Sequence, residues 1–234
     1  MLPLSDAKIL DSWSKNAAAW TDAVRKREIA SRRLVTDQAV IDAIMDSAPR
    51  TAIDLGCGEG WLVRELTRRG IETIGIDAVP ELVSKAQIAG GGQFKQLSFD
   101  DIAAGKLTLA ADAVICNFAL LGCESVNRLI AAIPRLLTPQ GRFIVQTLHP
   151  VAACGPHPYQ DGWREGSWDG FSARFVDPAP WYFRTLSSWI ALLADNGLHL
   201  TEMREPLHPA TQQPASVILI AGCDHAHRGS VAAT

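Results

Sequence analysis

The sequence lacks three features that would each assign the protein to a class. It has no charge excess: 22 lysine and arginine residues stand against 25 aspartate and glutamate residues, a formal net charge of -3. No overall positive field therefore draws the chain to nucleic acid or to an anionic membrane. No apolar run approaches the length of a membrane-spanning helix, and the first residues, "MLPLSDAKIL", lack the charged and apolar regions of a signal peptide.

Cysteine is scarce, and its spacing matches no known framework. The five cysteines form no CxxC pair and no zinc-site pattern, and several lie in apolar runs, where cysteine behaves as a small hydrophobic residue. We therefore expect reduced thiols, a cytoplasmic location and no metal site. The cysteines are Cys57, Cys116, Cys123, Cys154 and Cys223.

What the sequence does contain is a regular alternation of segment types. A chain of 234 residues can form one domain with a full core, or one domain with a cap. Residues 5–45 have helical periodicity and end before Pro49. Apolar runs typical of strands then alternate with helical segments, and the fourth run, residues 111–118, is typical of a buried parallel strand. The alternation predicts an α/β fold with a mostly parallel sheet and right-handed crossovers.

The predicted boundaries follow from this pattern. We expect a helical cap over residues 1–48, a main domain over residues 49–222 with an insert at about 149–184, and a polar tail over residues 223–234. The expected strands are 51–55, 72–78, 92–99, 111–118, 141–148, 198–205 and 214–222, with the last pair antiparallel. The expected helices of the main domain are 60–70, 80–87, 124–137 and 185–197.

A glycine-rich turn joins the first strand of the main domain to its helix. In "IDLGCGEGW", Gly56, Gly58 and Gly60 recur at every second residue. Glycine permits a positive φ and lets a ligand touch the backbone, and a helix start presents free N–H groups. Asp77 ends the second strand, where a carboxylate can accept both hydroxyls of a ribose. Together these features favour a ribose-bearing cofactor.

The spacing of the turn separates two classes of cofactor. Dinucleotide sites have GxGxxG, whereas this turn is GxGxG with Asp54 two residues before the first glycine. A carboxylate here repels a pyrophosphate and suits a cationic amino group. The pattern disfavours NAD and favours a ligand with ammonium and sulfonium charges. A nicotinamide-dependent oxidoreductase remains the alternative.

Four segments carry a resemblance to a known family: "AIDLGCGEG", "IGIDAVPELVSKA", "DAVICNFAL" and "LLTPQGRFIVQT", in order within residues 51–147. At this order and spacing the chain resembles the class I S-adenosylmethionine-dependent methyltransferases. The resemblance implies a Rossmann-like, doubly wound, seven-stranded sheet with helices on both faces and an antiparallel last strand. It also implies S-adenosylmethionine as cofactor and S-adenosylhomocysteine as product. The segment "YFRTLSSWIALLADNGLHLTEMREP" looks like small-molecule methyltransferases, nearest to the ubiquinone-biosynthesis type.

The resemblance also implies which residues hold the cofactor. Asp54 and the first glycines would take the methionine end, Asp77 the ribose, and Ala78 or Val79 the adenine. The family often has an acidic residue after the third strand, and the sequence leaves open which side chain serves here. Because the sequence departs from the family pattern at this position, a non-catalytic cofactor-binding module stays as a third hypothesis. The implied cofactor-binding residues are Asp54, Gly56, Gly58, Gly60, Asp77, Ala78, Val79, Ser98, Phe99, Asp100, Asn117 and Phe118.

The acceptor side is predicted from what surrounds the fifth strand. The residues from Asn117 to Leu120 depart from the Asn-Pro-Pro-aromatic motif of base-modifying relatives, which argues against nucleic acid. The insert has no helical or alternating period and collects aromatic residues, so we expect a lid over an acceptor pocket for a small molecule. The expected pocket residues are Trp13, Trp20, His149, Tyr159, Trp163, Trp168, Trp181 and Tyr182.

His149 is the candidate general base. Methyl transfer from a sulfonium needs mainly positioning, but a hydroxyl acceptor must also lose a proton. His149 follows the fifth strand and can titrate near neutrality; the alternative is a histidine that only bonds to a carbonyl. From their position we also expect Arg32, Arg33 and Thr36 to reach the cofactor carboxylate. The sequence leaves open the acceptor, the reacting atom and the oligomeric state.

Overall fold

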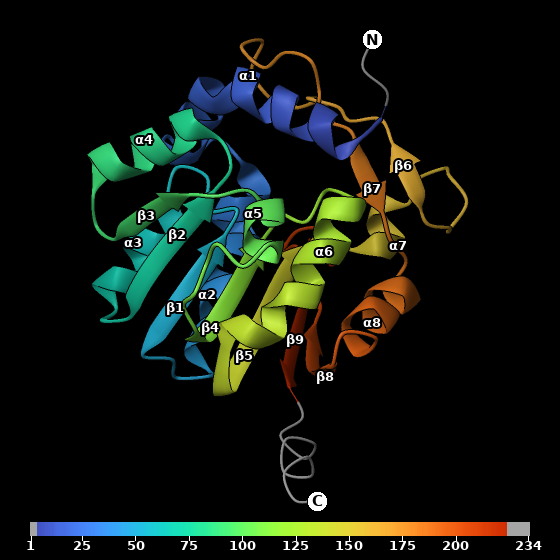
Figure 1. The fold of residues 1–234 in the computed structure, drawn as a ribbon. Helices are drawn as coiled ribbons and strands as arrows, with labels where there is room; N and C mark the ends of the chain where they lie inside the picture. Colours follow the sequence, from blue (N-terminus) through green and yellow to red (C-terminus); the bar gives the residue numbers. More distant parts are fainter. Residues whose placement is uncertain (1–3, 224–234) are drawn as a thin grey trace, which may run out of the picture.

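The computed structural model describes residues 4–223, and the greater part of the expected polar tail, with His225 and His227, lies outside them. Seven strands form one sheet in the order β3-β2-β1-β4-β5-β9-β8 (Figure 1). The last strand, β9, is antiparallel to both neighbours, whereas the other pairs are parallel. The predicted fold class is confirmed. The strands are β1 (Thr51–Leu55), β2 (Glu72–Asp77), β3 (Gln93–Gln96), β4 (Ala111–Asn117), β5 (Leu137–Thr147), β8 (Leu198–Arg204) and β9 (Val217–Cys223).

Helices cover both faces because alternate strand residues point to opposite sides. Ile53 and Phe143 belong to one core cluster, with residues of α6 (Glu124–Ala132) and α8 (Leu186–Ala194). Ala52 and Ile144 belong to the other, with residues of α2 (Asp37–Met45) and α3 (Trp61–Arg68). The sheet is therefore apolar on both faces, which leaves its carboxyl edge as the place for polar side chains.

The N-terminal segment is helical, as expected. It contains α1 (Asp6–Arg25), whose N-cap Ser5 accepts a hydrogen bond from the Lys8 backbone N–H, and a π-helical turn, η1 (Arg32–Thr36), that leads into α2. In Figure 1 α1 crosses above the carboxyl ends of the parallel strands, next to α4 (Pro80–Ala89). Within residues 4–223, no helix combines the length and the apolar character needed to span a membrane.

Several expected boundaries were wrong, among them the starts of the fifth and the last strand, which lie at Leu137 and Val217 rather than at residues 141 and 214. The third strand ends at Gln96 rather than Phe99, because Ser98 starts a further helix, α5 (Phe99–Ala103). There the Ser98 hydroxyl accepts from the Asp101 N–H and the Asp101 carboxylate accepts from the Ser98 N–H, a capping box. The helix expected over residues 124–137 ends at Ala132, and a 3₁₀ turn containing Pro134 follows. Proline lacks the N–H that would continue the helical ladder.

The insert is more regular than the sequence indicated. It contains a short helix, α7 (Pro150–Ala153), and two antiparallel strands, β6 (Gly162–Arg164) and β7 (Trp181–Phe183), that form a separate small sheet. The expectation of a stretch without regular structure was therefore wrong. Elements of three or four residues are too short to show a period in sequence, since one turn or two alternations give no repeat.

Candidate functional site

The glycine turn is held tightly against the end of β2. The Gly56 and Cys57 N–H groups both donate to the Ile76 carbonyl, at 2.8 and 3.0 Å. Gly56 has a φ of +78°, and a Cβ at that position would lie 2.3 Å from the Ala119 Cβ. No other residue fits there, because both the backbone angle and the space require the absence of a side chain. The turn can therefore bring its backbone close to a ligand at the sheet edge.

Asp77 is bound to the glycine turn itself. One carboxylate oxygen accepts from the Gly58 N–H and the other from the Val79 N–H, both at 2.8 Å. Burial raises the pKa of Asp77, and these backbone N–H groups oppose the rise. An ionised carboxylate can accept about four hydrogen bonds, so capacity remains for hydroxyl donors.

Asp54 is buried at the end of β1, with 2% of its surface exposed. Burial and, to a lesser extent, the negative charge of Asp77 raise the pKa of Asp54 to about 7, and the Arg32 guanidinium opposes both effects. Two carboxylates thus lie within electrostatic reach of each other below the turn. A ligand cation would stabilise the ionised form of both.

A row of polar side chains continues along the carboxyl edge. Asn117 and Gln146 are paired across β4 and β5, and both lie on the same sheet face as Asp54 by strand alternation. The Gln146 amide nitrogen donates to the Ser216 hydroxyl at 2.9 Å. Within the described residues, one side-chain oxygen each of Asn117, Gln146 and Thr36 is buried without a hydrogen-bond partner. Such atoms mark places where a ligand or water must bond, since an unpaired buried polar group is costly.

Gln146 and Ser216 were missed in the sequence. A signal was present for Gln146, which interrupts the apolar run "RFIVQTL" at a position that faces the same side as Asp54. Thr36, by contrast, was expected near the cofactor, and it is buried as that hypothesis requires. The Arg32 guanidinium lies 4.6 Å from the centroid of the Trp61 ring and bonds to Asp37, whereas Arg33 is exposed.

The residues expected near the adenine are not all brought together. Phe99 reaches the glycine turn, 3.9 Å from where a Gly56 Cβ would lie, and Ala78 and Val79 directly follow Asp77. Ser98 is engaged in its capping box. The Asp100 carboxylate is 60% exposed and bonds to the Arg128 Nε at 2.9 Å.

Phe118 turns the chain sharply at the end of β4. Its φ is +53°, a left-handed conformation that side chains rarely adopt, and its N–H donates to the Gln146 carbonyl at 2.8 Å. Strained backbone of this kind persists only where the surroundings enforce it, and it is concentrated at functional sites. The turn brings Ala119 against Gly56.

The aromatic residues expected to line one pocket form two clusters. Trp13 packs edge-to-face on Trp20 and on Trp168, with centroids 5.0 and 5.7 Å apart, and Phe171 and Phe175 extend this cluster. The second cluster lies at β6 and β7. It contains two separate sets of ring contacts, Tyr159–Phe183–Trp181 and Trp163–Tyr182, with centroids 5.6 to 5.9 Å apart.

A small cavity of about 10 Å³, room for about one water, lies beside the second cluster. Its walls come from the segments that directly follow β4 and β5 and from β7, so it adjoins the row of polar residues at the carboxyl edge. Trp181 and Tyr182 are the members of the predicted set that line it. The lining residues are Leu120, Leu121, Thr147, Leu148, Pro150, Ala153, Trp181, Tyr182, Phe183, Arg184 and Trp189.

His149 stands between two lining residues in the chain but does not itself line the pocket. It is 5% exposed, and its Nε2 lies 2.7 Å from a Glu205 carboxylate oxygen. Its Nδ1 is buried and has no partner within residues 4–223. If Glu205 holds the proton on Nε2, Nδ1 is left as a proton acceptor.

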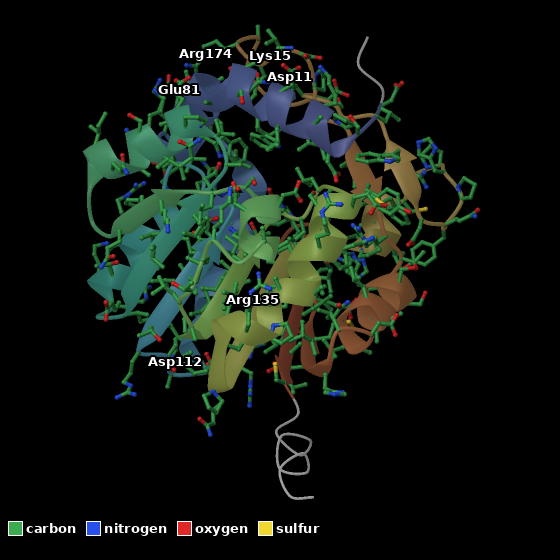
Figure 2. All side chains as sticks on the ribbon, in the orientation of Figure 1. Asp11, Lys15, Glu81, Asp112, Arg135 and Arg174 are labelled. Carbon is green, nitrogen blue, oxygen red and sulfur yellow. The ribbon has the colours of Figure 1, made fainter. Side chains whose placement is uncertain are left out.

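The insert is joined to α1 by both polar and charged contacts. The Asn16 side chain donates to the Val176 carbonyl at 2.7 Å and accepts from the Val176 N–H at 2.8 Å. Asp177 pairs with Lys8 and Lys15, and Arg174 pairs with Asp22. Figure 2 shows Arg174 near Lys15 and Asp11 at the outer side of α1. The insert therefore lies over the carboxyl edge as a lid would.

A buried glutamate joins α1 to the glycine turn, and no sequence pattern indicated its partners. The Glu59 side chain is fully buried, accepts from the Arg25 Nε at 2.8 Å, and pairs with Arg64 at 2.6 Å. Glu59 lies inside the turn, Arg25 at the end of α1 and Arg64 in α3.

Cys57, Cys116, Cys123 and Cys154 are free thiols, and no group of histidine, cysteine, aspartate and glutamate within the described residues could hold a metal ion. Burial raises the pKa of the Cys57 and Cys116 thiols well above the ordinary value. Buried protonated thiols behave as small apolar side chains rather than as nucleophiles.

The fold and this edge define the class. A seven-stranded sheet of this order, with an antiparallel β9 and a glycine turn between two strand-end aspartates, is the architecture of class I S-adenosylmethionine-dependent methyltransferases. Residues 53–145 match the methyltransferase domain family, which confirms the resemblance seen in the sequence motifs.

Relatives with assigned names agree with this class. The chain is 30% identical over 149 residues to a ubiquinone biosynthesis O-methyltransferase of Xanthomonas oryzae pv. oryzae, covering 62% of each chain. It is 29% identical over 120 residues to a demethylmenaquinone methyltransferase of Deinococcus radiodurans, covering 49% of each. The similarity thus spans less than two thirds of these relatives.

Solved structures share the fold. An S-adenosylmethionine-dependent methyltransferase of Mesorhizobium loti superimposes with a TM-score of 0.59 at 22% identity, over 77% of this chain and 95% of that one. A second structure is a 1,6-didemethyltoxoflavin-N1-methyltransferase of Burkholderia thailandensis with bound 1,6-didemethyltoxoflavin and S-adenosylhomocysteine. It superimposes with a TM-score of 0.66 at 17% identity, over 96% of this chain and 93% of that one. At these identities the likeness concerns the fold alone.

Proposed function

We propose that the protein transfers a methyl group from S-adenosylmethionine to a small organic acceptor, at oxygen or nitrogen, and releases S-adenosylhomocysteine. One observation carries the proposal: two aspartates end adjacent strands below a turn that only glycine can form. A pyrophosphate would meet the charges of Asp54 and Asp77, whereas an ammonium and a sulfonium would be attracted to them. This favours the methyl donor over a nicotinamide cofactor.

The residues present fit such a cofactor. Asp77 would accept the ribose hydroxyls, and Asp54 would accept the amino group of the methionine part. The unpartnered oxygen of Thr36 offers a further hydrogen bond at this edge. The bound cofactor would supply the activated methyl, and the chain would position the acceptor in line with it.

The insert and His149 support the part of the proposal that concerns the acceptor. The insert lies over the carboxyl edge and would exclude water when the acceptor is bound. His149 Nδ1 would take the proton from a hydroxyl or amine acceptor, with Glu205 holding the other ring nitrogen. The names of the ubiquinone-type relatives support a small acceptor. Composition still supports a cytoplasmic protein without nucleic-acid or membrane partners.

The first test is calorimetric titration of the purified protein with S-adenosylhomocysteine and, separately, with NADH. We expect micromolar binding of S-adenosylhomocysteine alone. Binding of NADH alone would replace the proposal with a nicotinamide-dependent oxidoreductase. Binding of S-adenosylhomocysteine without turnover of labelled methyl donor on any acceptor panel would favour the non-catalytic cofactor-binding module.

The role of His149 has its own test. We expect His149→Ala to lower kcat by about 100-fold or more, the usual contribution of a general base, while the Kd for S-adenosylhomocysteine stays within about twofold. His157→Ala, in an exposed part of the same insert, is the control. Unchanged turnover on the true acceptor would make His149 a structural residue.

A further inference from the structure

Trp20, on α1, lies against the glycine turn. Its indole Nε1 is 3.5 Å from the place where a Cβ of Gly58 would stand, and the Gly58 N–H donates to the Asp77 carboxylate. Together with Trp13, Trp20 also packs against a buried cluster that contains Val79, two residues after Asp77. Trp20 thus borders both parts of the edge that the proposed function assigns to the cofactor, the turn and the segment after Asp77.

The same side chain contacts the insert. The Trp20 ring centroid lies 6.4 Å from that of Phe171 and 5.0 Å from that of Trp13, which in turn packs edge-to-face on Trp168 at 5.7 Å. Trp20, Trp168 and Phe171 all pack against a second buried cluster, which contains Phe175. Close-packed rings leave little room for independent movement, so a change in the position of Trp20 also changes its contacts with the insert.

The insert can leave α1 only if this second cluster opens. Arg174 is exposed, whereas Phe175, the next residue, is buried in the cluster. The backbone of Val176 is held by the fully buried Asn16 side chain. A protease needs an extended stretch of chain on both sides of the bond that it cuts. Cleavage after Arg174 therefore requires that the insert separates from α1, and its rate reports how often this happens.

We propose that Trp20 covers the bound cofactor at the glycine turn and couples cofactor binding to the docking of the insert on α1. The coupling rests on the proposed function for the identity of the cofactor. A cofactor held by Asp77 and the turn would contact Trp20 only while α1 and the insert are in place. By linkage, cofactor binding then stabilises the docked insert by the same factor by which docking strengthens cofactor binding. The cover would thus be firmly closed only over a loaded cofactor site.

Limited proteolysis of the full chain with trypsin, with and without saturating S-adenosylhomocysteine, tests this coupling. Cleavage after Lys106 is the internal reference, because Lys106 lies in an exposed loop that precedes β4, at the other end of the strands. We expect S-adenosylhomocysteine to slow cleavage after Arg174 by about tenfold or more, and cleavage after Lys106 by less than about twofold. Trp20→Ala should reduce the protection at Arg174 to less than about threefold, with Trp20→Phe between the variant and wild type.

Leu10→Ala is the matched control. Leu10 is a large apolar residue of the same helix, but it is 45% exposed and lies outside both clusters around Trp20. This variant should keep the full protection at Arg174. Equal protection at Arg174 and Lys106 would mean that the cofactor acts on global stability alone. That result, the absence of protection, or full protection in Trp20→Ala would each overturn the coupling.

The comparison of the two cleavage sites in wild type decides even if Trp20→Ala does not fold. Calorimetry on the same protein separates this inference from the proposed function. Binding of S-adenosylhomocysteine without selective protection of Arg174 would remove the coupling alone. Absence of S-adenosylhomocysteine binding would remove the proposed function, and the coupling with it.

Discussion

Two carboxylates at neighbouring strand ends give the candidate site its chemical character. Asp54 is buried and Asp77 is half-buried, and each raises the cost of ionising the other. Parallel strands place their carboxyl ends along one edge, so residues 23 positions apart in the chain become neighbours. The edge is therefore suited to a cation with hydroxyl groups nearby, which is the description of S-adenosylmethionine.

Asp77 is the first residue to test. We expect Asp77→Ala to weaken S-adenosylhomocysteine binding by about 1.5–3 kcal/mol, the range for hydrogen bonds to a charged group, measured by calorimetry. Asp112→Ala is the matched control, because its carboxylate also accepts from two backbone N–H groups, those of Arg50 and Thr51. It lies at the edge of the sheet away from α1 (Figure 2). An unchanged dissociation constant in Asp77→Ala would remove Asp77 from the ribose site.

Asp54 makes the stability of the unliganded protein depend on pH. Its pKa is about 7 in the folded state and about 3.9 in an unfolded chain. Between these values the folded state holds a proton that the unfolded state releases, so stability falls as pH rises from about 4 to 7 and levels off above. Asp54→Asn removes this loss. We expect the free energy of unfolding of the variant, relative to that of wild type, to rise by up to about 4 kcal/mol between pH 4 and pH 8.

Urea unfolding at several pH values between 4 and 8 measures this effect. Asp42→Asn, which removes an exposed aspartate from α2, controls for the loss of a negative charge and should shift stability equally at each pH. A stability difference between Asp54→Asn and wild type that does not change with pH would mean that Asp54 is ionised throughout this range.

At the scale of elements, the insert and α1 form one cover over the carboxyl edge. The Asn16 side chain bonds to Val176 as a strand backbone would, and the Trp13 cluster packs the two segments together. Charged pairs at the outer side add little, because exposed ion pairs contribute about 0–1 kcal/mol. The docking of the insert thus depends on Asn16, on the buried Ser12, whose hydroxyl donates to the Asp177 carbonyl at 2.5 Å, and on the aromatic residues.

Asn16→Ala tests this docking. It leaves the Val176 N–H and carbonyl without their partner, and we expect a loss of about 1–3 kcal/mol in the free energy that holds the insert on α1. Limited proteolysis with trypsin should cut faster after Arg174 in the variant. Ser14→Ala is the control, since Ser14 lies on the same helix and its hydroxyl bonds only to the Leu10 carbonyl. Equal cleavage rates would mean that the insert is held by other contacts.

At the scale of the whole molecule, Glu59 connects the cap, the cofactor turn and the first helix of the main domain. Its side chain is fully buried, and its negative charge is paired with Arg25 and Arg64, which are only partly exposed. A change at Glu59 therefore acts on the orientation of α1 as well as on the turn. We therefore expect changes at Glu59 to affect both stability and cofactor binding.

Glu59→Gln should lower the free energy of unfolding by on the order of 3 kcal/mol, because breaking a buried ion pair leaves charges uncompensated. It should also weaken S-adenosylhomocysteine binding, since the turn loses its anchor. Glu65→Gln is the control: Glu65 also pairs with two arginines, Arg68 and Arg69, but its side chain is 17% exposed rather than fully buried, and both partners lie at the end of its own helix. We expect this control to lower the free energy of unfolding by less than about 1 kcal/mol. Equal losses in the two variants would contradict the anchoring role.

Local patterns predicted most of the fold because helices and strands follow from spacing within a few residues. The strand order and the antiparallel β9 agree with the expected architecture, and Gly56 stands where only glycine fits. The failures were also local. The β3 strand was drawn too long because the Ser98 capping box was overlooked, and the insert elements are too short to show a period.

The sequence by itself determined the fold class, the glycine turn and the two strand-end aspartates, because each depends on neighbours within a few positions. Only the tertiary structure decided which distant side chains meet. It engaged Asp100 with Arg128, divided the aromatic residues among separate clusters, and bonded Arg184 to the Gly122 and Cys123 carbonyls. These outcomes depend on chain segments that approach through packing, and the spacing of residues along a chain does not encode such approaches.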